Sequence, residues 1–284
     1  MMTKNFSFEF FPPKTDEGRD KLAITRRQLA QLKPDFFSVT YGAGGTTRDR
    51  TLEAVQEIHQ AGLNVAPHLA CMGTSREEVK QLLQRYQSMG IRRLVALRGD
   101  MPSGMGGASG DFKYASDLIT FIRQETDDWF HLEVAAYPES HPQARTAQEN
   151  LKFFKIKVEA GANSALTQYF YHESAYAQFV EDCQANGIDI PIVPGIMPIN
   201  NFSQLCRFSD ACGAEIPRWV RQKMLGFGDD GISIRAFGLD VVTHLCDKLL
   251  QQGAPGLHFY TMNQAGLTGV IWERLGLGAQ PKAI

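Results

Sequence analysis

The sequence has no excess of charge of either sign and no long apolar run, and these absences exclude two classes of protein. Its 284 residues include 29 Lys and Arg and 31 Asp and Glu, for a formal net charge of -2. Such a balance offers no electrostatic footprint for nucleic acid or for an anionic membrane. No apolar stretch approaches the roughly 18 residues that cross a bilayer, and the amino end has no signal-peptide core. We therefore expect a cytoplasmic protein without nucleic-acid or membrane partners.

Cysteine is scarce, and motifs for metal or nucleophilic chemistry are missing. The five cysteines are odd in number and contain no C-x-x-C pair, so neither a disulfide framework nor a zinc knuckle is expected. The seven histidines show no H-x-H or H-E-x-x-H spacing, which leaves little support for a metal. G-x-S-x-G and a phosphate-binding P-loop are also absent. We expect the cysteines to be small core residues: Cys71, Cys183, Cys206, Cys212 and Cys246.

Short β-rich runs alternate with helical patterns along the whole chain. This alternation predicts parallel strands joined by helical crossovers. Eight such units in slightly more than 250 residues favour a closed (β/α)8 TIM barrel over an open doubly wound sheet, whose first turn would carry a glycine fingerprint. We expect one catalytic domain over residues 1–284. The predicted strands are 6–11, 36–41, 65–71, 94–98, 132–137, 165–170, 190–194 and 256–261.

Some helix boundaries are signalled independently of the apolar pattern. Ser75-x-x-Glu78 predicts a capping box at the start of one helix, which should stop at Gly90. A long helix is expected at about 233–250, and another after the last strand. The pair Arg92 and Arg93 precedes an apolar strand, and we interpret it as a solvated strand entry.

One carboxylate, Glu9, stands inside the apolar segment SFEFFPP at residues 7–13. Burial disfavours the charged form of an acid, so Glu9 is expected to keep its proton to a higher pH than a free glutamate. A protonated carboxyl group at a strand end suits a general acid near neutral pH. A structural ion pair, or an edge-strand residue facing water, is the alternative.

Nearly every predicted strand ends in a polar or aromatic residue. In a barrel of this kind, chemistry takes place at the carboxyl ends of the strands. Any one of these residues could be structural, but together they favour a site. The planar rings suit a flat aromatic ligand, which Gly99 and Ala135 would let the backbone approach. The strand-end residues are Glu9, Thr40, Tyr41, His68, Arg98, Gly99, Asp100, Tyr137, His141, Gln168 and Tyr260.

A helix after the fifth strand carries a second candidate binding surface. Asn150, Phe153 and Lys157 recur at helical spacing, which could hold a nucleotide with Lys157 on a phosphate and Phe153 beside a ring. An ordinary solvated helix face remains the alternative. The glycine-rich loop at 104–110 nearly spells G-x-G-x-x-G, but it lies well beyond its strand, and we interpret it as a lid.

These segments together resemble the methylenetetrahydrofolate reductase family. Each segment is weak alone, but they fall in order and cover the chain nearly end to end. They are SFEFFPP (7–13), SVTYGA (38–43), APHL (66–69), LRGD (97–100), YASDL (114–118), AAYPE (135–139), HP (141–142), AGAN (160–163), TQ (167–168), PGI (194–196) and HFYT (258–261).

The resemblance implies a flavoprotein oxidoreductase of one-carbon metabolism and methionine biosynthesis. It implies bound FAD, and NADH or NADPH as hydride donor in ping-pong order with 5,10-methylenetetrahydrofolate. Glu9 would protonate the folate nitrogen, and Asp100 would lie near the flavin and tune its hydride affinity. The implied flavin-binding residues are Thr40, Tyr41, His68, Leu97, Arg98, Gly99, Asp100, Tyr114, Ala115, Ala135, Tyr137, His141, Ala144, Asn150, Phe153, Ile156 and Lys157.

The resemblance also implies a substrate site and a homo-oligomer. Glu9, Thr40, Gln168, Gln204, Phe208, Tyr260 and Gln264 would contact folate or nicotinamide. Gln264 replaces the family's usual arginine and Asn150 its usual aspartate, and loss of the guanidinium is expected to weaken binding. Two other hypotheses are a pterin-binding methyltransferase or metal-assisted lyase, and a non-catalytic flavin- or folate-binding protein.

Overall fold

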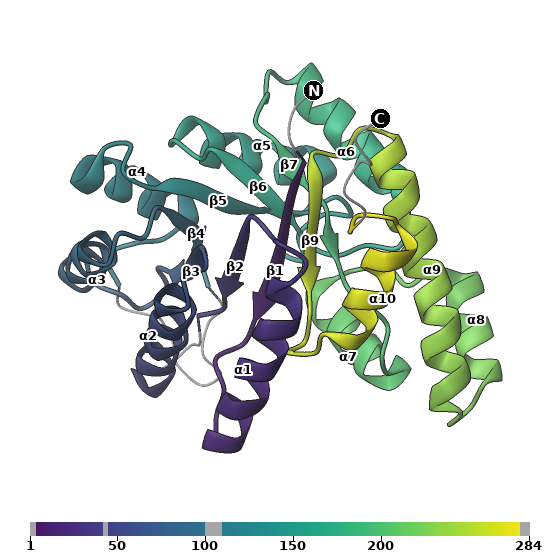
Figure 1. The fold of residues 1–284 in the computed structure, drawn as a ribbon. Helices are drawn as coiled ribbons and strands as arrows, with labels where there is room; N and C mark the ends of the chain where they lie inside the picture. Colours follow the sequence, from purple (N-terminus) through teal and green to yellow (C-terminus); the bar gives the residue numbers. More distant parts are fainter. Residues whose placement is uncertain (1–3, 42–44, 100–109, 279–284) are drawn as a thin grey trace, which may run out of the picture.

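The computed structural model describes residues 4–41, 45–99 and 110–278, which form a parallel β-barrel surrounded by helices (Figure 1). The predicted lid at 104–110 lies outside these residues apart from Gly110, and so does Asp100. The strands are β1 (Asn5–Phe10), β2 (Phe36–Val39), β3 (Val65–Ala70), β4 (Arg93–Leu97), β5 (His131–Ala136), β6 (Ser164–Thr167), β7 (Ile192–Val193), β8 (Gly195–Ile196) and β9 (Gly256–Tyr260).

The strand order shows how the barrel closes. All pairings are parallel, in the order β7-β6-β5-β4-β3-β2-β1-β9-β8. β7 and β8 are two halves of one segment, interrupted by Pro194, which has no N–H to donate. β7 pairs with β6 and β8 pairs with β9, so this segment joins the two ends of the sheet. The predicted (β/α)8 barrel is confirmed; the predicted seventh strand at 190–194 contains β7, and β8 follows directly after it.

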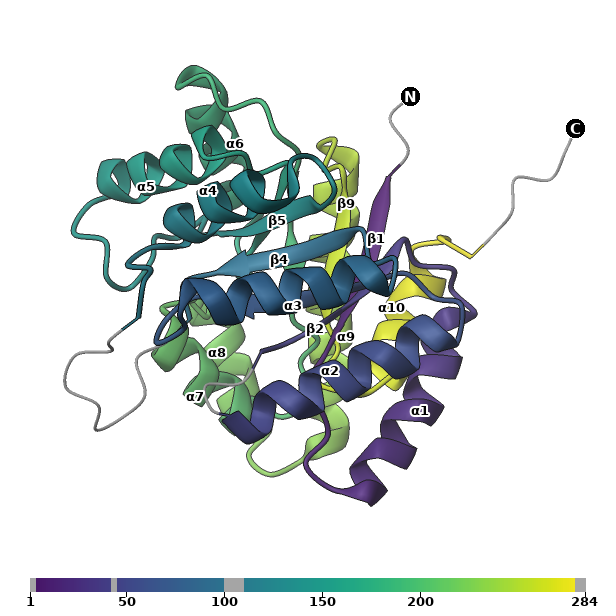
Figure 2. The ribbon, with the colours of Figure 1, turned by 90° about the vertical axis from the view of Figure 1, so that its left-hand side faces the viewer.

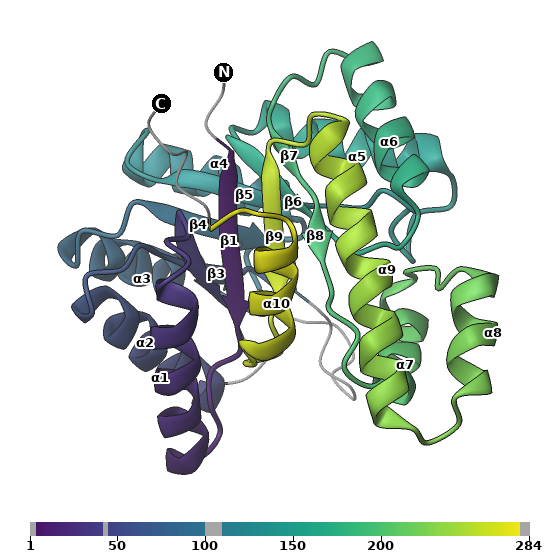
Figure 3. The ribbon, with the colours of Figure 1, turned by 45° about the vertical axis from the view of Figure 1, so that its right-hand side comes forward.

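Helices alternate with the strands through β6 and then depart from the simple pattern. Figure 2 shows α2 and α3 covering the side of the barrel formed by the first strands. After β8 the chain makes three helices in succession, and Figure 3 shows α7 and α8 beside the long α9. The sequence pattern did not predict α7 or α8. The helices are α1 (Asp16–Ala30), α2 (Gly45–Gln60), α3 (Arg76–Ser88), α4 (Ala115–Thr126), α5 (Ala147–Glu159), α6 (Glu173–Ala185), α7 (Phe202–Cys212), α8 (Arg218–Gly226), α9 (Gly231–Gln251) and α10 (Gly266–Arg274).

The predicted capping box is present at α3. Ser75 Oγ accepts a hydrogen bond from the Glu78 amide at 3.2 Å, and the Glu78 carboxylate accepts one from the Ser75 amide at 2.8 Å. Two of the amide groups that a helix start leaves unpaired are thus satisfied. α9 spans the long helix expected at 233–250 and begins after the cap Asp230. No helix in the described part of the chain is long and apolar enough to cross a membrane.

Alternation along the strands divides the core into an outer and an inner part. On β1, Phe8 and Phe10 point outward, where Phe8 packs on Trp272 of α10 with ring centroids 5.8 Å apart. Ser7 and Glu9 therefore point into the barrel. The apolar part of the interior is small, so polar side chains share it. The apolar interior residues are Phe36, Ala66, Val95, Leu166 and Val193, with Leu97 beside them.

At the amino end of the barrel, the structure contradicts the prediction that Arg93 is part of a solvated strand entry. Arg93 is not a solvated strand entry, because its guanidinium pairs with the buried Glu133 and lies 4.5 Å from the centre of the Phe36 ring. Arg92 alone is exposed, with its guanidinium over Trp129.

Among the cysteines, the core assignment is confirmed for Cys71, Cys183 and Cys246, whereas Cys206 and Cys212 are only partly buried.

Candidate active site

The predicted site residues gather at one end of the barrel. In Figure 1 the arrowheads of β1 and β9 point toward the side where α7 lies, and parallel strands place their carboxyl ends together there. Glu9 lies one residue before the end of β1, and Tyr260 is the last residue of β9. His68 lies two residues before the end of β3, and the other strands contribute residues just after their ends: Thr40, Tyr41, Arg98, Gly99, Tyr137 and Gln168.

Glu9 is a buried carboxylate held between two histidines. Its Oε2 lies 3.3 Å from Nε2 of His68 and 3.5 Å from Nε2 of His258. Neither ring nitrogen has a hydrogen-bond partner elsewhere in the described chain. Burial raises the pKa of Glu9, but hydrogen bonding and charge from His258 and His68 outweigh it and lower the pKa to about 2. The expectation of a raised pKa was wrong, because the sequence did not reveal the two imidazoles.

His258 is a site residue that sequence reasoning left without a role. It is fully buried, and its Nδ1 lies 2.7 Å from the hydroxyl of Ser7. Its ring stacks on Phe36 at 6.2 Å and meets the edge of Tyr260 at 5.2 Å. A pattern did exist, because Ser7 and Glu9 on β1, and His258 and Tyr260 on β9, are each two residues apart and so face the same side.

Tyr260 forms a fixed wall of the site. Its hydroxyl donates a 2.6 Å hydrogen bond to the carbonyl of Thr167, which is the last residue of β6. Burial raises the pKa of Tyr260 well above its usual value, so the phenol stays neutral. The side chain therefore offers a ring and no charge.

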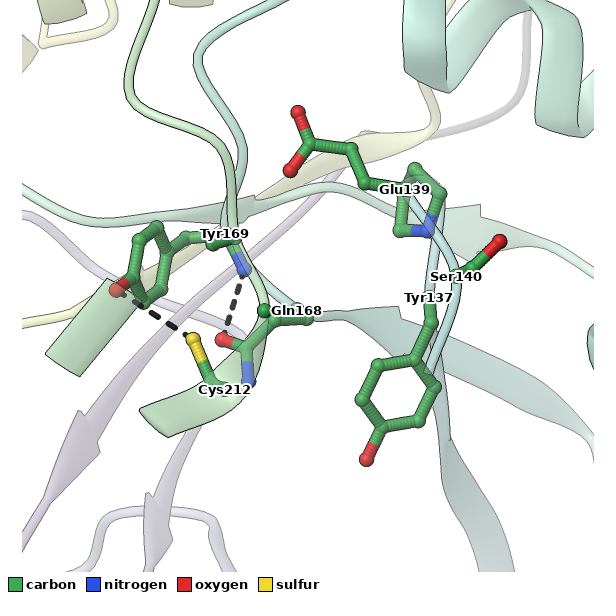
Figure 4. Close-up of a pocket in the computed structure, with 9 residues that line it drawn as sticks. Tyr137, Glu139, Ser140, Gln168, Tyr169 and Cys212 are labelled. Atoms are coloured by element: carbon green, nitrogen blue, oxygen red, sulfur yellow. Dashed lines mark hydrogen bonds between the residues drawn. The ribbon is translucent and has the colours of Figure 1, made fainter. Parts of the chain in front are cut away.

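Gln168 lies at the edge of a small pocket beside this wall. Its Oε1 accepts a hydrogen bond from the Tyr169 amide at 3.0 Å, and the pocket is also lined by Tyr137, Glu139 and Cys212. In Figure 4 the Tyr137 ring and the Gln168 amide point to one side, and the Glu139 carboxylate points away from them. Gln168 and Tyr137, predicted from their strand ends, thus line one pocket, and their role in binding stays a prediction.

A second pocket unites three predicted substrate residues from distant parts of the sequence. Gln204 and Phe208, on α7, and Gln264, after β9, line the same pocket. Gln264 accepts a 3.2 Å hydrogen bond from the side chain of Asn200. Phe208 keeps 37% of its surface exposed, so a ring face is available to a ligand. The lining side chains are all uncharged: Met197, Pro198, Asn200, Asn201, Gln204, Leu205, Phe208, Met262 and Gln264.

Exposed aromatic rings mark the outer end of the predicted flavin site. Tyr114, just before α4, stacks on Phe153 of α5 with centroids 6.2 Å apart, and both rings remain more than 40% exposed. Ile156 is also exposed on α5, and Ala115 is the first residue of α4. Large apolar side chains left in water on a helix pair are typical of a ligand surface.

Lys157, one turn after Phe153 on α5, supplies a partly buried cation. Its ammonium group donates a hydrogen bond to the carbonyl of Ala135 on β5 and lies 5.5 Å from the centre of the Phe154 ring. Burial lowers the pKa of Lys157 to about 8. An ammonium group without a carboxylate partner suits an anionic ligand such as a phosphate.

The loop after β5 is held by Asn150 rather than by a ligand. The Asn150 amide group donates to the carbonyl of Tyr137 at 2.9 Å, and its oxygen accepts from the amide of His141 at 3.2 Å. His141 Nδ1 accepts from the amide of Gln143, whose side chain in turn accepts from Arg98 at 2.6 Å. The Ala144 amide bonds to the His141 carbonyl at 2.8 Å. An uncharged amide suits Asn150, because it must both donate and accept.

These residues fit a flavin dinucleotide. Gly99 has φ +85° after β4, and a Cβ there would lie 3.0 Å from Cβ of Ala70, so a side chain would be strained. Exposed rings, a buried ammonium group and open strand ends are the features that an adenine, a pyrophosphate and a planar ring system require. Among residues 4–41, 45–99 and 110–278, no group of three His, Cys, Asp or Glu side chains is placed to hold a metal.

Comparison with known proteins gives one consistent family. A sequence model of the methylenetetrahydrofolate reductase family matches residues 2–276. The 5,10-methylenetetrahydrofolate reductase of Escherichia coli K12 is 42% identical over 274 residues, covering 96% of this chain and 91% of the relative. The corresponding protein of Pectobacterium carotovorum is 41% identical, covering 96% and 90%. A probable methylenetetrahydrofolate reductase (NADH) of Oryza sativa is 37% identical, covering 98% of this chain and 49% of its own length.

Solved structures support the fold. An uncharacterized protein from Clostridium thermocellum, which binds two copies of 5-methyl-5,6,7,8-tetrahydrofolic acid, superposes with a TM-score of 0.69 at 16% identity. The match covers 97% of this chain and 94% of that structure. With the family match over nearly its whole length, the chain belongs to the methylenetetrahydrofolate reductase family.

Proposed function

We propose that this enzyme reduces 5,10-methylenetetrahydrofolate with bound FAD as the hydride carrier and NADH or NADPH as the donor. Membership of the family supports the reduction of methylenetetrahydrofolate as the activity of this enzyme. It argues against the methyltransferase, lyase and binding-protein hypotheses. The cofactor, the donor and the ping-pong order are the proposal. The observation that supports it best is that α5 carries both the desolvated ammonium group of Lys157 and, one turn earlier, Phe153 of the exposed Tyr114–Phe153 pair.

The residues that would hold FAD follow from their positions. When bound, FAD would supply a two-electron carrier that takes a hydride from NAD(P)H and returns it to the one-carbon unit, so both substrates would use one space in turn. Lys157 and Arg98 would contact the phosphates. Tyr114, Ala115, Phe153 and Ile156 would contact the adenine end. The planar ring would lie on Thr40, Tyr41, His68, Leu97, Gly99, Ala135 and Tyr137, with Asp100 nearby and Asn150, His141 and Ala144 shaping the loop.

Glu9 would supply the proton of the folate half-reaction. Opening the one-carbon bridge requires a proton on the departing nitrogen, and Glu9 is a carboxyl group at the barrel mouth that could reach it. Gln168, Gln204, Phe208, Tyr260 and Gln264 would form the walls around the folate, with Thr40 near the nicotinamide.

The assembly and the setting of the enzyme are also proposals. Apolar side chains on α8 and α9 are exposed, with Trp219 at 56%, Leu225 at 64% and Ile232 at 75%, which supports a homo-oligomer. The five cysteines are free thiols, which supports work in a reducing cytoplasm. We treat residues 1–284 as one catalytic domain.

A visible spectrum tests the cofactor directly. Protein purified with added FAD should show flavin absorbance bands, and anaerobic addition of NADH or NADPH should bleach them. The faster of the two nicotinamides identifies the donor. Protein that stays colourless in excess FAD would overturn the cofactor assignment.

The role of Glu9 is tested by separating the two half-reactions. In Glu9→Gln, folate reduction should fall at least about 100-fold relative to NAD(P)H oxidation by a quinone, because only the folate half needs the proton. Glu181→Gln, an exposed change on α6, is the matched control and should keep the parent ratio. Equal loss of both activities in Glu9→Gln would show that Glu9 has a structural role instead.

A further inference from the structure

His258 is a buried titratable group that the proposed reaction does not yet use. It lies inside the barrel with no exposed surface, and its Nε2 is 3.5 Å from the Glu9 oxygen. His68 of β3 approaches the same oxygen, at 3.3 Å. A single carboxylate oxygen thus faces two imidazoles whose Nε2 atoms have no hydrogen-bond partner other than Glu9 in the described chain.

The far side of the His258 ring is held in a way that tolerates both protonation states. Nδ1 of His258 lies 2.7 Å from the hydroxyl of Ser7. A hydroxyl group can either donate or accept, so the contact survives when the ring gains or loses a proton. A carboxylate at this place would favour only the charged ring. Phe36 stacks on the same ring and fixes its plane.

Glu9 by itself is poorly suited to keep a proton in the ligand-free enzyme. Burial raises its pKa, but the two histidines lower it to about 2, so the carboxyl group is ionised at neutral pH. A proton that reaches the folate must therefore come from a neighbouring group. An imidazole is the side chain whose ordinary titration lies near neutral pH.

Resting on the function proposed above, we propose that His258 is a positioning residue that stores the proton which Glu9 delivers to the folate nitrogen. The transfer moves the proton from Nε2 of His258 to Oε2 of Glu9 and from Glu9 to the folate nitrogen. His258 ends neutral, Glu9 ends as a carboxylate and the nitrogen gains one proton. Solvent then restores the proton through Glu9, which balances the one proton that the overall reduction consumes.

The other groups around the pair do not compete for this role. Tyr260 meets the His258 ring edge-on, and burial keeps its phenol neutral. Arg93 lies beyond Phe36, with its guanidinium on the Phe36 ring and paired with Glu133. His68 is the only other titratable side chain that an ion-pair distance joins to Glu9 in the described chain, so it can replace His258 in part.

The test is the pH profile of His258→Gln in the FAD-loaded enzyme. Without the imidazole, the proton must reside on the Glu9 carboxyl group, whose pKa His68 still lowers against the effect of burial. In a plot of the rate of folate reduction against pH, the alkaline limb is the fall in rate at high pH. Its midpoint should lie at least about one pH unit lower in His258→Gln than in the parent. The ratio of folate reduction to NAD(P)H oxidation by a quinone should fall about tenfold or more at pH 7.5 and recover toward acid pH.

A matched control comes from the opposite end of the barrel. His131 opens β5 and also lies beside a serine and a buried glutamate, 2.6 Å from Ser164 and 3.4 Å from Glu133. His131→Gln makes the same chemical change away from the mouth, so the profile should match that of the parent. Ser7→Ala, which removes only the Nδ1 contact, should shift the limb in the same direction as His258→Gln but by less.

The outcomes separate the inference from the function it rests on. If the parent enzyme does not reduce methylenetetrahydrofolate, the proposed function fails. If the parent reduces methylenetetrahydrofolate, and His258→Gln has the same alkaline limb and the same ratio of folate reduction to NAD(P)H oxidation as the parent, the role of His258 as a proton store is disproved. Equal loss of both half-reactions at every pH would also overturn it, since that is what a purely structural histidine gives. If His258→Gln does not fold, the limb of Ser7→Ala decides, and an unchanged limb there rejects the inference.

Discussion

At the scale of single residues, the site depends on charges whose partners the chain brings from far away. Glu9 and His258 are separated by 249 residues in sequence, yet Oε2 and Nε2 are 3.5 Å apart. Local sequence correctly predicted that Glu9 is buried, and burial alone would have raised its pKa. The direction reversed because β9, which pairs with β1, and β3, two strands away on the other side, each contribute an imidazole. A pKa is thus a property of the fold and not of the segment.

The lowered pKa of Glu9 has a consequence for stability. Its pKa is about 2 when folded and 4.5 ordinarily, so the ionised form stabilises the fold above pH 4.5, and this contribution is lost as the pH falls toward 2. The difference in free energy of unfolding between the parent and Glu9→Gln should shrink by about 2 kcal/mol from pH 5 to pH 3. Urea unfolding at both pH values measures it, and a constant difference would contradict the lowered pKa.

At the scale of elements, the pattern of apolar residues was enough to predict the strands. It was not enough to predict which side chains enter the barrel. All eight predicted strands exist, because each is a short apolar run bounded by turn residues. Arg93 was misassigned because a charged residue at a strand start gives no sign of whether its side chain enters the barrel. α7 and α8 were missed because they interrupt the regular strand–helix alternation.

The candidate site was predictable to the extent that strand ends define it. Tyr137, Gln168 and Tyr260 were predicted because barrel chemistry gathers at those ends, and the structure places all three there. The meeting of Gln204 with Gln264 came from family resemblance alone, since α7 and the segment after β9 are not neighbours in any local pattern. His258 needed the register of β9 beside β1.

The Arg93–Glu133 pair should be a strong link between β4 and β5. Arg93→Met leaves the Glu133 carboxylate buried without its guanidinium and should cost about 3–5 kcal/mol of stability. Replacing both residues in Arg93→Met/Glu133→Leu should cost less than the sum of the single changes, because no uncompensated charge remains. Urea unfolding of the four proteins gives the coupling energy, and strictly additive effects would refute the link.

Two helical glycines should respond in opposite ways to alanine. In α9, a Cβ on Gly238 would lie 2.7 Å from Cβ and 2.9 Å from the carbonyl oxygen of Ile199, so Gly238→Ala should cost about 1–3 kcal/mol. In α10, a Cβ on Gly269 meets nothing within 4 Å, and Gly269→Ala should gain up to about 1 kcal/mol of helix propensity. Unfolding midpoints measure both, and a neutral Gly238→Ala would show that the α9 contact can relax.

At the scale of the whole molecule, the proposed cofactor would contact several consecutive strands and two helices of the barrel at once. Its predicted partners come from β2 to β5, α4 and α5, whereas the substrate pockets come from β6, α7 and the segment after β9. A ligand that binds only the folded barrel stabilises all of it in proportion to the logarithm of its concentration. Binding at one helix should therefore be visible in the unfolding of the entire protein.

FAD should raise the free energy of unfolding of the parent by about 2.7 kcal/mol at 100 times its dissociation constant. Lys157→Met should lose much of this gain at the same FAD concentration, because the buried ammonium group would no longer meet the phosphates. Lys155→Met is the matched control, since the Lys155 ammonium group bonds to the Asn186 carbonyl at the surface, and it should behave as the parent does.

The same lysine should make FAD affinity depend on pH. Burial lowers the pKa of Lys157 to about 8, so above that pH the free protein must take up a proton to present the charged form to a phosphate. The dissociation constant of the parent should rise by up to about tenfold per pH unit above pH 8, and that of Lys157→Met should stay level. Fluorescence titrations with FAD at pH 7, 8 and 9 provide the measurement. Parallel curves for the two proteins would mean that Lys157 does not contact the phosphates, and the nucleotide would then have to lie elsewhere than on α5.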